Sequence, residues 1–221
     1  MKNWVAILSI AVLVAAPTVV SADGDYDGDY YEVTVTNLTR GQSFTPILVA
    51  THRAGVMLFE TGQPASPELA LLAEGGKTAP LTANLEANPE VQQVITIPGL
   101  LGPGASVTAR IKTQGNFDHL SMASMLIPTN DGFFALENVR GPRGNRRQEF
   151  ESPAYDAGSE PNDELCSNIP GPVCGGEGAS PNAGGEGVVH IHAGIHGIGN
   201  LVASDRDWRN PVARISVRRV H

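Results

Sequence analysis

The stretch YEVTVTN, residues 31–37, alternates apolar and polar side chains with a period of two. Tyr31, Val33 and Val35 fall on one face of an extended chain, and the charged and hydroxyl side chains between them fall on the other. One face would therefore be buried and the other exposed to solvent. This pattern predicts a half-buried β-strand.

Similar stretches recur along the chain and predict the fold class. Further strands are predicted at residues 44–50, 91–97, 106–112, 120–127, 133–137, 188–192 and 213–220. Clusters of Gly, Pro, Asn and Asp separate them, as turns between short antiparallel strands require. One helix is predicted at residues 67–73, with Ser66 as its N-cap and Gly75 just past its end. We therefore predict an all-β fold, an antiparallel β-sandwich with long loops and at most one or two short helices.

Residues 1–22 have the layout of a secretory signal peptide. Lys2 supplies a positive charge, residues 5–14 form an apolar run, and small residues up to Ala22 form a cleavage site. The alternative, a membrane anchor, needs about 20 apolar residues, and Pro17 interrupts the run before that length. We therefore expect export, either to the periplasm or beyond the cell.

The chain that remains after this cleavage is acidic. The whole sequence carries a formal charge of −8, and the removed segment carries only the charge of Lys2, so residues 23–221 carry −9. An acidic surface disfavours nucleic acid as a partner, and no later segment reaches membrane-spanning length. Residues 23–30 form an acidic lead-in whose first residues imitate a calcium loop but lack its closing glutamate. Residues 31–221 form the predicted domain.

Residues 137–187 depart from the strand pattern, because they are polar and rich in Gly, Pro, Asn and Arg. We predict a long loop region there. It contains both cysteines of the chain, Cys166 and Cys174. In an oxidising compartment such a pair forms a disulfide by default, which would stabilise the fold by about 2–3 kcal/mol. The spacing is not the C-x-x-C of a redox or zinc pair, so the disulfide is predicted to be structural.

Three acidic residues form the first candidate site. Asp131 lies in a turn directly after an apolar strand, and Asp156 and Glu160 flank Gly158, where the chain can fold back. Converging carboxylates repel each other unless a cation neutralises them, and hard oxygen ligands of this kind suit Ca²⁺. From spacing alone, ordinary solvated loop acids are the favoured interpretation, because acids in loops are common.

Three histidines, His190, His192 and His196, form the second candidate site. The first two point to the same face of a strand, and a turn at Gly194 would bring His196 back to them. Imidazole triads bind Zn²⁺ or Cu²⁺, with Asp205 and Asp207 as possible outer partners in the chain. The favoured interpretation is two outward histidines before a Gly-rich turn. The sequence lacks the G-x-S-x-G, H-E-x-x-H and Walker motifs, so an enzyme is not predicted.

Two segments resemble a known family: SMLIPTNDGFFAL at residues 124–136 and SPAYDAGSE at residues 152–160. They are similar to paired motifs of the spondin domain, found in F-spondin and in stand-alone bacterial proteins. The resemblance extends over residues 31–220. It implies a C2-like antiparallel sandwich with a calcium ion held at one loop edge by Asp131, Asp156 and Glu160.

The sequence departs from the spondin pattern at two positions of this implied site. Glu160 stands where animal members have Asp, which lengthens the side chain by one methylene. Gly132 stands where the family has an aromatic residue, which removes a packing group. Glutamate also binds calcium, even bidentately, so these departures bear on the affinity of the site.

Together these observations predict an exported calcium-binding module that binds an extracellular or envelope polymer or protein surface, as in adhesion. The alternative is a periplasmic or secreted Zn²⁺ or Cu²⁺ protein, a carrier or a hydrolase, that uses His190, His192 and His196. A third alternative is a structural envelope protein whose calcium only stabilises the fold.

Overall fold

The computed structural model describes residues 18–19, 29–180 and 184–221. The predicted signal peptide, apart from Thr18 and Val19, lies outside the described residues, as do positions 23–28 of the acidic lead-in. Both stay predictions. Among the described residues, no helix combines the length and the apolar character that crossing a membrane requires.

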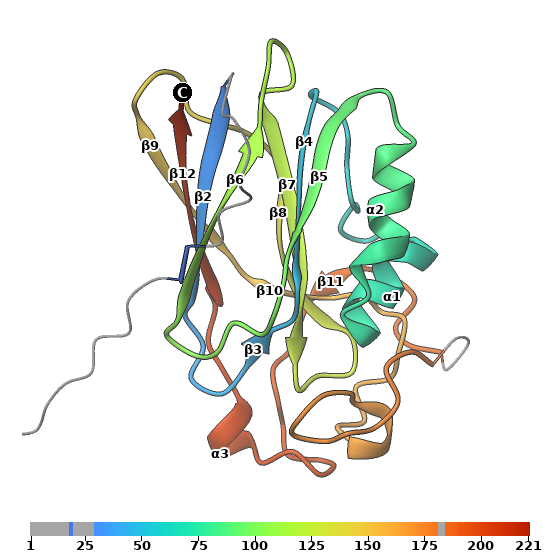
Figure 1. The fold of residues 1–221 in the computed structure, drawn as a ribbon. Coiled ribbons are helices and arrows are strands. Elements are labelled where there is room, and N and C mark those ends of the chain that lie inside the picture. Colours follow the sequence, from blue (N-terminus) through green and yellow to red (C-terminus); the bar gives the residue numbers. More distant parts are fainter. Residues whose placement is uncertain (1–17, 20–28, 181–183) are drawn as a thin grey trace, which may run out of the picture.

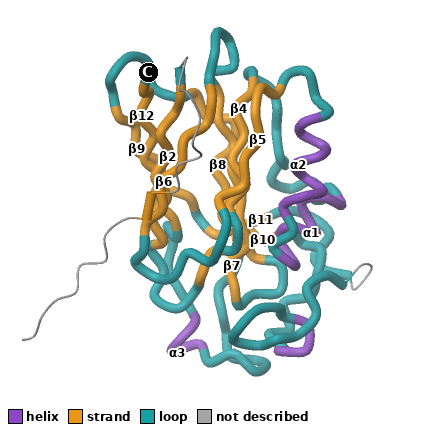
Figure 2. The backbone as a smooth tube through the Cα atoms, viewed as in Figure 1, coloured by secondary structure: helices purple, strands orange, loops and turns teal. Residues whose placement is uncertain are grey.

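Two β-sheets face each other and enclose the core (Figures 1 and 2). In the described part of the chain, the first sheet has five strands in the order β1-β6-β2-β12-β9. Their bounds are Thr18–Val19 (β1), Ser106–Lys112 (β6), Tyr30–Asn37 (β2), Ala213–Val220 (β12) and Arg147–Ser152 (β9). The neighbours β6, β2, β12 and β9 pair antiparallel, and the two-residue β1 pairs parallel with β6.

The second sheet carries the candidate sites. Its order, within the described residues, is β11-β10-β8-β7-β4-β5, with β3 beside β7. Their bounds are His190–Ile191 (β11), Ala154–Asp156 (β10), Gly132–Arg140 (β8), His119–Ile127 (β7), Ile47–His52 (β4), Val91–Ile97 (β5) and Ser43–Phe44 (β3). All its pairings are antiparallel. The predicted all-β sandwich is therefore confirmed.

The period of two in β2 has the predicted consequence. Its residues alternate between half-buried and buried along the whole strand, and Tyr31, Val33 and Val35 are buried in the core between the sheets. At about 25 cal/mol per Å² of apolar surface removed from water, such burial is the main favourable term in folding.

Helices cover the outer face of the second sheet, beside β4 and β5 in Figure 1. They are α1 (Pro67–Gly75) and α2 (Thr78–Glu86). As a result β4 is buried on both faces. Ile47 and Val49 belong to the core between the sheets, whereas Leu48 and Ala50 belong to a second core under the helices. This double burial explains why β4 and β7 read as nearly continuous apolar runs.

The helix predicted at residues 67–73 is present and two residues longer. The Ser66 hydroxyl accepts a hydrogen bond from the Leu69 N–H at 3.2 Å, and Gly76, in the left-handed region at φ 63°, ends the helix. The sequence did not predict α2, which has no side-chain N-cap and carries Pro80 in its first turn. With the four-residue α3 (Ala203–Arg206), the described residues contain three α-helices instead of one or two.

The predicted long loop region, residues 137–187, needs correction at its N-terminal end. It contains the end of β8, then β9 and β10. The strand β9 lies at the edge of the first sheet and pairs with β12 alone. Most of its side chains are exposed, so no apolar alternation marks it in the sequence. In the described residues of the remaining connection from β10 to β11, the 3₁₀-helix at Cys166–Asn168 is the regular element.

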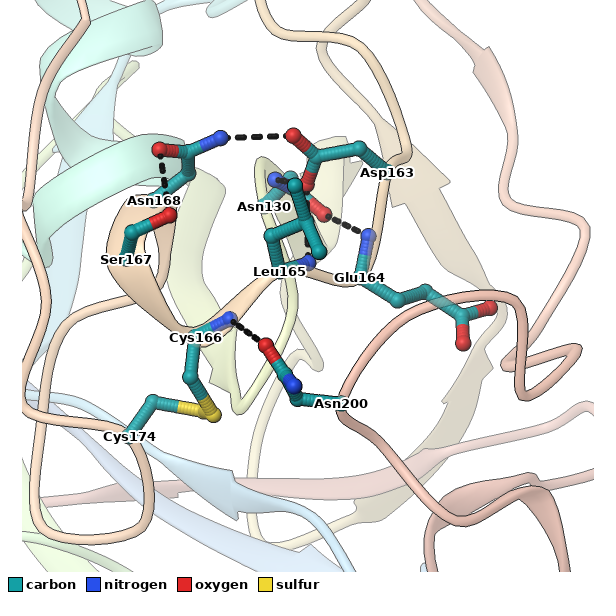
Figure 3. Close-up of a disulfide and its surroundings, with 9 residues drawn as sticks. All are labelled: Asn130, Asp163, Glu164, Leu165, Cys166, Ser167, Asn168, Cys174 and Asn200. Carbon is teal, nitrogen blue, oxygen red and sulfur yellow. Dashed lines mark hydrogen bonds between the residues drawn. A yellow bond between two sulfur atoms is a disulfide. The ribbon is translucent and has the colours of Figure 1, made fainter.

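This connection is held by a disulfide and by two hydrogen-bonded groups (Figure 3). The predicted bond between Cys166 and Cys174 is present. The Asn200 side chain accepts a hydrogen bond from the Cys166 N–H at 2.9 Å. In addition, the buried carboxylate of Glu164 accepts hydrogen bonds from three consecutive backbone N–H groups, at residues 196–198, at 2.5–3.0 Å. These contacts join two loops whose contacting residues are 32–34 positions apart in the chain.

Candidate metal centre

The turn between β7 and β8 positions Asp131. The Thr129 hydroxyl donates to the Leu126 carbonyl at 2.5 Å and accepts a hydrogen bond from the Gly132 N–H at 3.0 Å, which closes the turn. Asp131 is completely buried within it. Local side-chain hydrogen bonding of this kind is the reason why Thr and Asp are frequent in turns.

The two carboxylate oxygens of Asp131 differ in their surroundings. Oδ2 accepts hydrogen bonds from the backbone N–H groups of Ser159 and Glu160, at 2.8 and 3.0 Å, and from the Ser159 hydroxyl at 3.2 Å. Oδ1 is buried and has no hydrogen-bond partner among the described residues. Asp131 thus joins the loop after β10 to the turn after β7, and it has one free acceptor.

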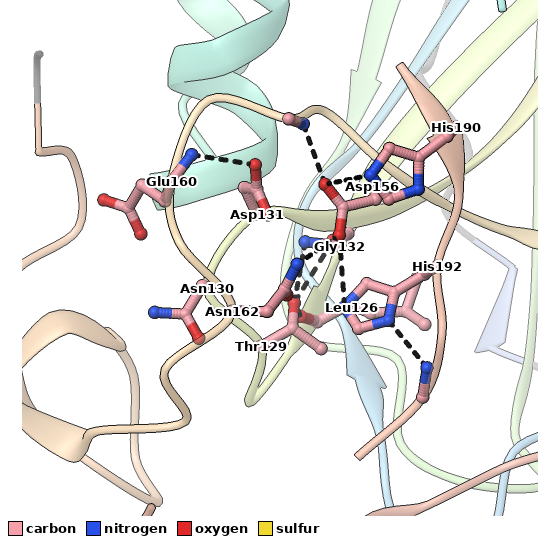
Figure 4. A network of polar contacts seen from close by, with 12 residues as sticks. Leu126, Thr129, Asn130, Asp131, Gly132, Asp156, Glu160, Asn162, His190 and His192 are labelled. Atoms are coloured by element: carbon pink, nitrogen blue, oxygen red, sulfur yellow. Dashed lines mark hydrogen bonds and ion pairs between the residues drawn. The ribbon is translucent and has the colours of Figure 1, made fainter. Parts of the chain in front are cut away.

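Strand pairing places Asp156 at the centre of the site (Figure 4). In β10 it lies opposite Gly132 of β8 on one side and opposite His190 of β11 on the other. Its carboxylate is fully buried. Oδ1 accepts a hydrogen bond from the Gly158 N–H at 2.8 Å, and Oδ2 accepts one from the Asn162 side chain at 2.7 Å.

His190 presents a nitrogen lone pair to Asp156. Its Nδ1 lies 3.0 Å from the Ile191 carbonyl, which only accepts hydrogen bonds, so Nδ1 carries the proton. In the neutral ring Nε2 is then an acceptor, and it lies 3.6 Å from Asp156 Oδ1 and 3.9 Å from Glu186 Oε2. Nε2 has no hydrogen-bond partner within the described residues. Three acceptors therefore face each other with no donor between them.

His192 has the opposite tautomer. Its Nδ1 accepts a hydrogen bond from the Gly194 N–H at 2.9 Å, so in the neutral ring the proton lies on Nε2. Nε2 is 3.9 Å from Asp156 Oδ2, and the side chain is buried. In this tautomer His192 directs a donor toward Asp156 and has no lone pair available there for a metal.

Gly132 provides the space for His192. A Cβ atom added at this glycine would lie 2.9 Å from Cδ2 of His192 and 2.8 Å from the Thr129 hydroxyl. The imidazole instead packs against Trp208, with 5.0 Å between the ring centroids. The departure from the spondin pattern at Gly132 is thus accompanied by the imidazole ring of His192, which follows β11 in the chain.

Sequence reasoning missed Glu186. The ligand atoms of Asp156, Glu186 and His190 all lie within 4.8 Å of one another. The Asn162 side chain donates to Asp156 and also, at 3.2 Å, to Glu186. Glu186 follows a Gly-rich stretch without periodicity, so only its position four residues before His190 could have marked it.

Two predicted residues lie differently from the rest. The backbone N–H of Glu160 binds Asp131, but in Figure 4 the Glu160 carboxylate points away from Asp131, and it is buried without a hydrogen-bond partner among the described residues. The side chain of His196 is exposed, and no hydrogen bond or ion pair in the described structure joins it to His190 or His192. The structure therefore brings Asp131, Asp156, His190 and His192 together.

Burial and charge shift the pKa values of the groups at this site. Burial, followed by the negative charge of Asp156, raises the pKa of Asp131 to about 7. Burial also raises the pKa of Glu160 to about 7. Burial alone would lower the pKa of His190, but its bond to the Ile191 carbonyl and the charges of Asp156 and Glu186 raise it. Burial lowers the pKa of His192 and keeps its ring neutral. A cation bound at this edge would favour the charged carboxylates.

Comparisons with known proteins bear on part of this region. The family model described as Spondin_N matches residues 30–159. A comparison with curated proteins gives no match. The matched segment contains Asp131 and Asp156, whereas Glu160, Glu186 and the two histidines lie beyond its end.

Proposed function

This chain belongs to the Spondin_N family, and on that premise we propose that it is an exported calcium-binding module whose loop edge binds a polymer or protein surface outside the cell. The family domain and the Cys166–Cys174 disulfide both fit such a protein, because disulfides form and persist in oxidising compartments. The periplasm and the extracellular space are both compartments of this kind.

The observation that carries the calcium proposal is the unpartnered Oδ1 of Asp131. Leaving a buried acceptor unsatisfied costs about 1–3 kcal/mol, and more when it is charged. Asp156 lies close enough to raise the pKa of Asp131 by its charge. A hard cation near both carboxylates would satisfy the free oxygen and remove the repulsion between them.

Glu160 is the third proposed calcium ligand, and it would have to turn toward the ion. Neither of its carboxylate oxygens has a hydrogen-bond partner among the described residues, but Ser180 lies near enough to lower the pKa of Glu160, so turning would also move the carboxylate away from Ser180. Its backbone is already fixed next to the site by the hydrogen bond to Asp131. Backbone carbonyls and water would complete the six to eight oxygen ligands that calcium takes.

The same end of the sandwich offers a surface for a partner. Asn130, next to Asp131, donates a hydrogen bond to Asp163 at 2.9 Å. This bond links the turn between β7 and β8 to the loop that contains the disulfide. Leu165, Ile198 and Val202 are exposed on these loops, at 42%, 70% and 56% of their full accessibility. These exposed apolar side chains are available to contact a partner. Calcium would make this edge rigid for binding.

Thermal unfolding of residues 23–221 tests the calcium site. Melting with EDTA and then with Ca²⁺ should show stabilisation by RT ln(1 + [L]/Kd), about 2.7 kcal/mol at 100 Kd. Asp131→Asn should abolish this gain. The matched control is Glu137→Gln, a change of another partly buried carboxylate at the far end of β8, which should keep the gain. A wild-type protein that melts at the same temperature with EDTA and with Ca²⁺ would contradict the proposal.

Co-sedimentation tests the partner. The protein should sediment with insoluble surface material of the cells that produce it when Ca²⁺ is present, and remain in solution with EDTA. Asp131→Asn should remain in solution in both cases. If wild type and Asp131→Asn sediment with the surface material in EDTA as fully as wild type does with Ca²⁺, calcium has no role in partner binding.

The second candidate function, a Zn²⁺ or Cu²⁺ protein, is favoured by a specific observation at His190 only. Its free Nε2 faces two carboxylates. In the described structure, His196 does not belong to a cluster of three residues that could hold a metal ion.

A further inference from the structure

We propose that Asp156, Glu186 and His190 form a site for a transition-metal ion such as Zn²⁺. This ligand set shares Asp156 with the oxygen ligands proposed for calcium and differs from them in its other two members. The site combines one imidazole nitrogen with two carboxylates. It does not depend on calcium binding, although the two sets share Asp156.

The distances between the three ligand atoms fit a small ion. Zinc binds imidazole nitrogen and carboxylate oxygen at about 2.0–2.2 Å in tetrahedral geometry, so neighbouring ligand atoms lie about 3.4 Å apart. His190 Nε2 lies 3.6 Å from Asp156 Oδ1 and 3.9 Å from Glu186 Oε2. The two distances from His190 are therefore within a few tenths of an ångström of the tetrahedral spacing, and the ligand atoms of Asp156 and Glu186 lie within 4.8 Å of each other. Glu186 and His190 are partly exposed, which allows them to move and supplies a path of entry.

The hydrogen bonds of His190 are those of a metal ligand. A ligating histidine donates its other ring N–H to a carbonyl or carboxylate, which fixes the tautomer and the ring orientation. The Nδ1 contact with the Ile191 carbonyl has this form, and it directs the Nε2 lone pair at the two carboxylates. A lone pair facing negative oxygens is unfavourable unless a positive charge lies between them.

A second, independent observation comes from His192. Its side chain is only 2% exposed, its Nε2 has no hydrogen-bond partner among the described residues, and it faces Oδ2 of Asp156, whereas His190 faces Oδ1. Asp156 thus accepts hydrogen bonds from Gly158 and Asn162, and His192 Nε2 lies 3.9 Å from its Oδ2. Such contacts orient a ligating carboxylate. His192 is therefore a positioning residue, and Gly132 is the residue that admits its ring.

The chemistry of the three ligands selects the ion. Calcium takes oxygen ligands, six to eight of them. Imidazole nitrogen favours zinc and its neighbours in the first transition series. With three protein ligands a tetrahedral ion keeps one position for water or for an anionic group of a partner. Because Asp156 belongs to both sets, zinc and calcium should compete for the protein.

Two conservative changes separate the sites. Equilibrium dialysis of residues 23–221 against ZnCl₂ or CaCl₂, with the bound metal measured, should give one zinc per chain. Glu186→Gln should lower zinc affinity at least tenfold and leave calcium binding unchanged. Glu160→Gln should do the reverse, so failure of the calcium proposal is distinguishable from failure of this one. Zinc binding equal to wild type in Glu186→Gln would overturn the assignment.

A control and a spectrum complete the test. His196→Gln changes an exposed histidine in the loop after β11 and should leave zinc binding unchanged. If this variant loses zinc binding, the three histidines form the metal site and our assignment is overturned. Co²⁺ bound in place of zinc should give the visible absorption of a tetrahedral nitrogen and oxygen site, and His190→Gln should abolish that absorption. If His190 instead carries a proton shared with Asp156, wild type will bind no zinc or cobalt.

Discussion

The hairpin formed by β7 and β8 carries a buried polar cluster at each end, and the two clusters differ in what satisfies them. At the turn, Asp131 and Asp156 meet His190, and free acceptors remain on Asp131 and on the histidine ring. At the other end, His52, Ser121 and Glu137 form a cluster in which both histidine nitrogens have partners, while Glu137 Oε2 has none among the described residues.

This second cluster centres on Ser121, which is fully buried. The Nδ1 of His52 lies 2.8 Å from the Arg53 carbonyl, so its Nε2 accepts from the Ser121 hydroxyl at 2.9 Å. The Asn138 N–H donates to the same hydroxyl at 2.8 Å, and the Leu58 N–H donates to Glu137 at 2.9 Å. Burial raises the pKa of Glu137 to about 7, so a proton can neutralise this carboxylate.

The difference teaches how to tell a structural cluster from a binding site. Both ends hold carboxylates and histidines that are buried or half-buried, so burial alone does not distinguish a structural cluster from a binding site. In the second cluster each nitrogen of His52 faces a group of complementary hydrogen-bonding type. At the turn, a lone pair and two carboxylates converge. That mismatch is what an external cation would resolve.

Asp156→Asn should have the largest effect on the difference between the two clusters. It removes the one carboxylate common to both proposed metal sites, so the stabilisation by Ca²⁺ and by Zn²⁺ should both disappear. At 100 Kd each ion contributes about 2.7 kcal/mol, which for a domain of this size corresponds to about 5–10 °C in Tm. Calorimetric melting measures it. Ser121→Ala, a change in the second cluster, should melt earlier yet respond fully to both ions; a full response of Asp156→Asn would disprove the shared role.

Gly132→Ala should have the next largest effect, because its Cβ would meet the ring of His192. Overpacking of this kind costs about 1–3 kcal/mol. Adding His192→Ala removes the obstacle, so the double variant should be more stable than the sum of the two single losses predicts, by about 1 kcal/mol. Urea unfolding with EDTA measures this cycle. Strict additivity would show that the glycine and the histidine are not coupled.

Glu137→Gln should have the smallest effect, and its sign depends on pH. The pKa of Glu137 is about 7 in the folded protein and 4.5 for the unperturbed side chain, so the folded state binds more protons between these values. Its contribution to stability therefore falls as pH rises from about 4.5 to 7. The variant lacks this titrating group, so at pH 8 its free energy of unfolding should exceed that of wild type by about 1–2 kcal/mol, a value reduced to allow for the partial exposure of Glu137. At pH 4 the variant should have no such advantage. Urea unfolding at both pH values checks it; equal differences would contradict the raised pKa.

Much of the fold follows from local patterns in the sequence. The bounds of β5, β6 and β12 agree with the predicted ones because turn residues flank β5 and β6 and precede β12. The N-cap Ser66 marked α1. The edge strand β9 escaped prediction because its charged side chains face solvent and its pairing with β12 is set by tertiary structure.

The site could be predicted only as far as residues lie in regular structure or in the spondin motifs. Asp131 and Asp156 are in those motifs, and the spacing of His190 and His192 placed them on one face. Glu186 lies in an irregular connection, where no period relates residue number to direction. The orientation of Glu160 was equally inaccessible, because its backbone, and not its carboxylate, contacts Asp131.

The carboxylate of Glu164, held by the three N–H groups of residues 196–198, has a consequence for affinity. A loop fixed in this way has lost most of its conformational entropy during folding. A partner that binds the exposed side chain of Ile198 would therefore not have to order the loop that presents it. Since immobilising flexible groups is one of the main costs of association, this internal carboxylate should make the nearby surface a tighter binder than its area alone would suggest.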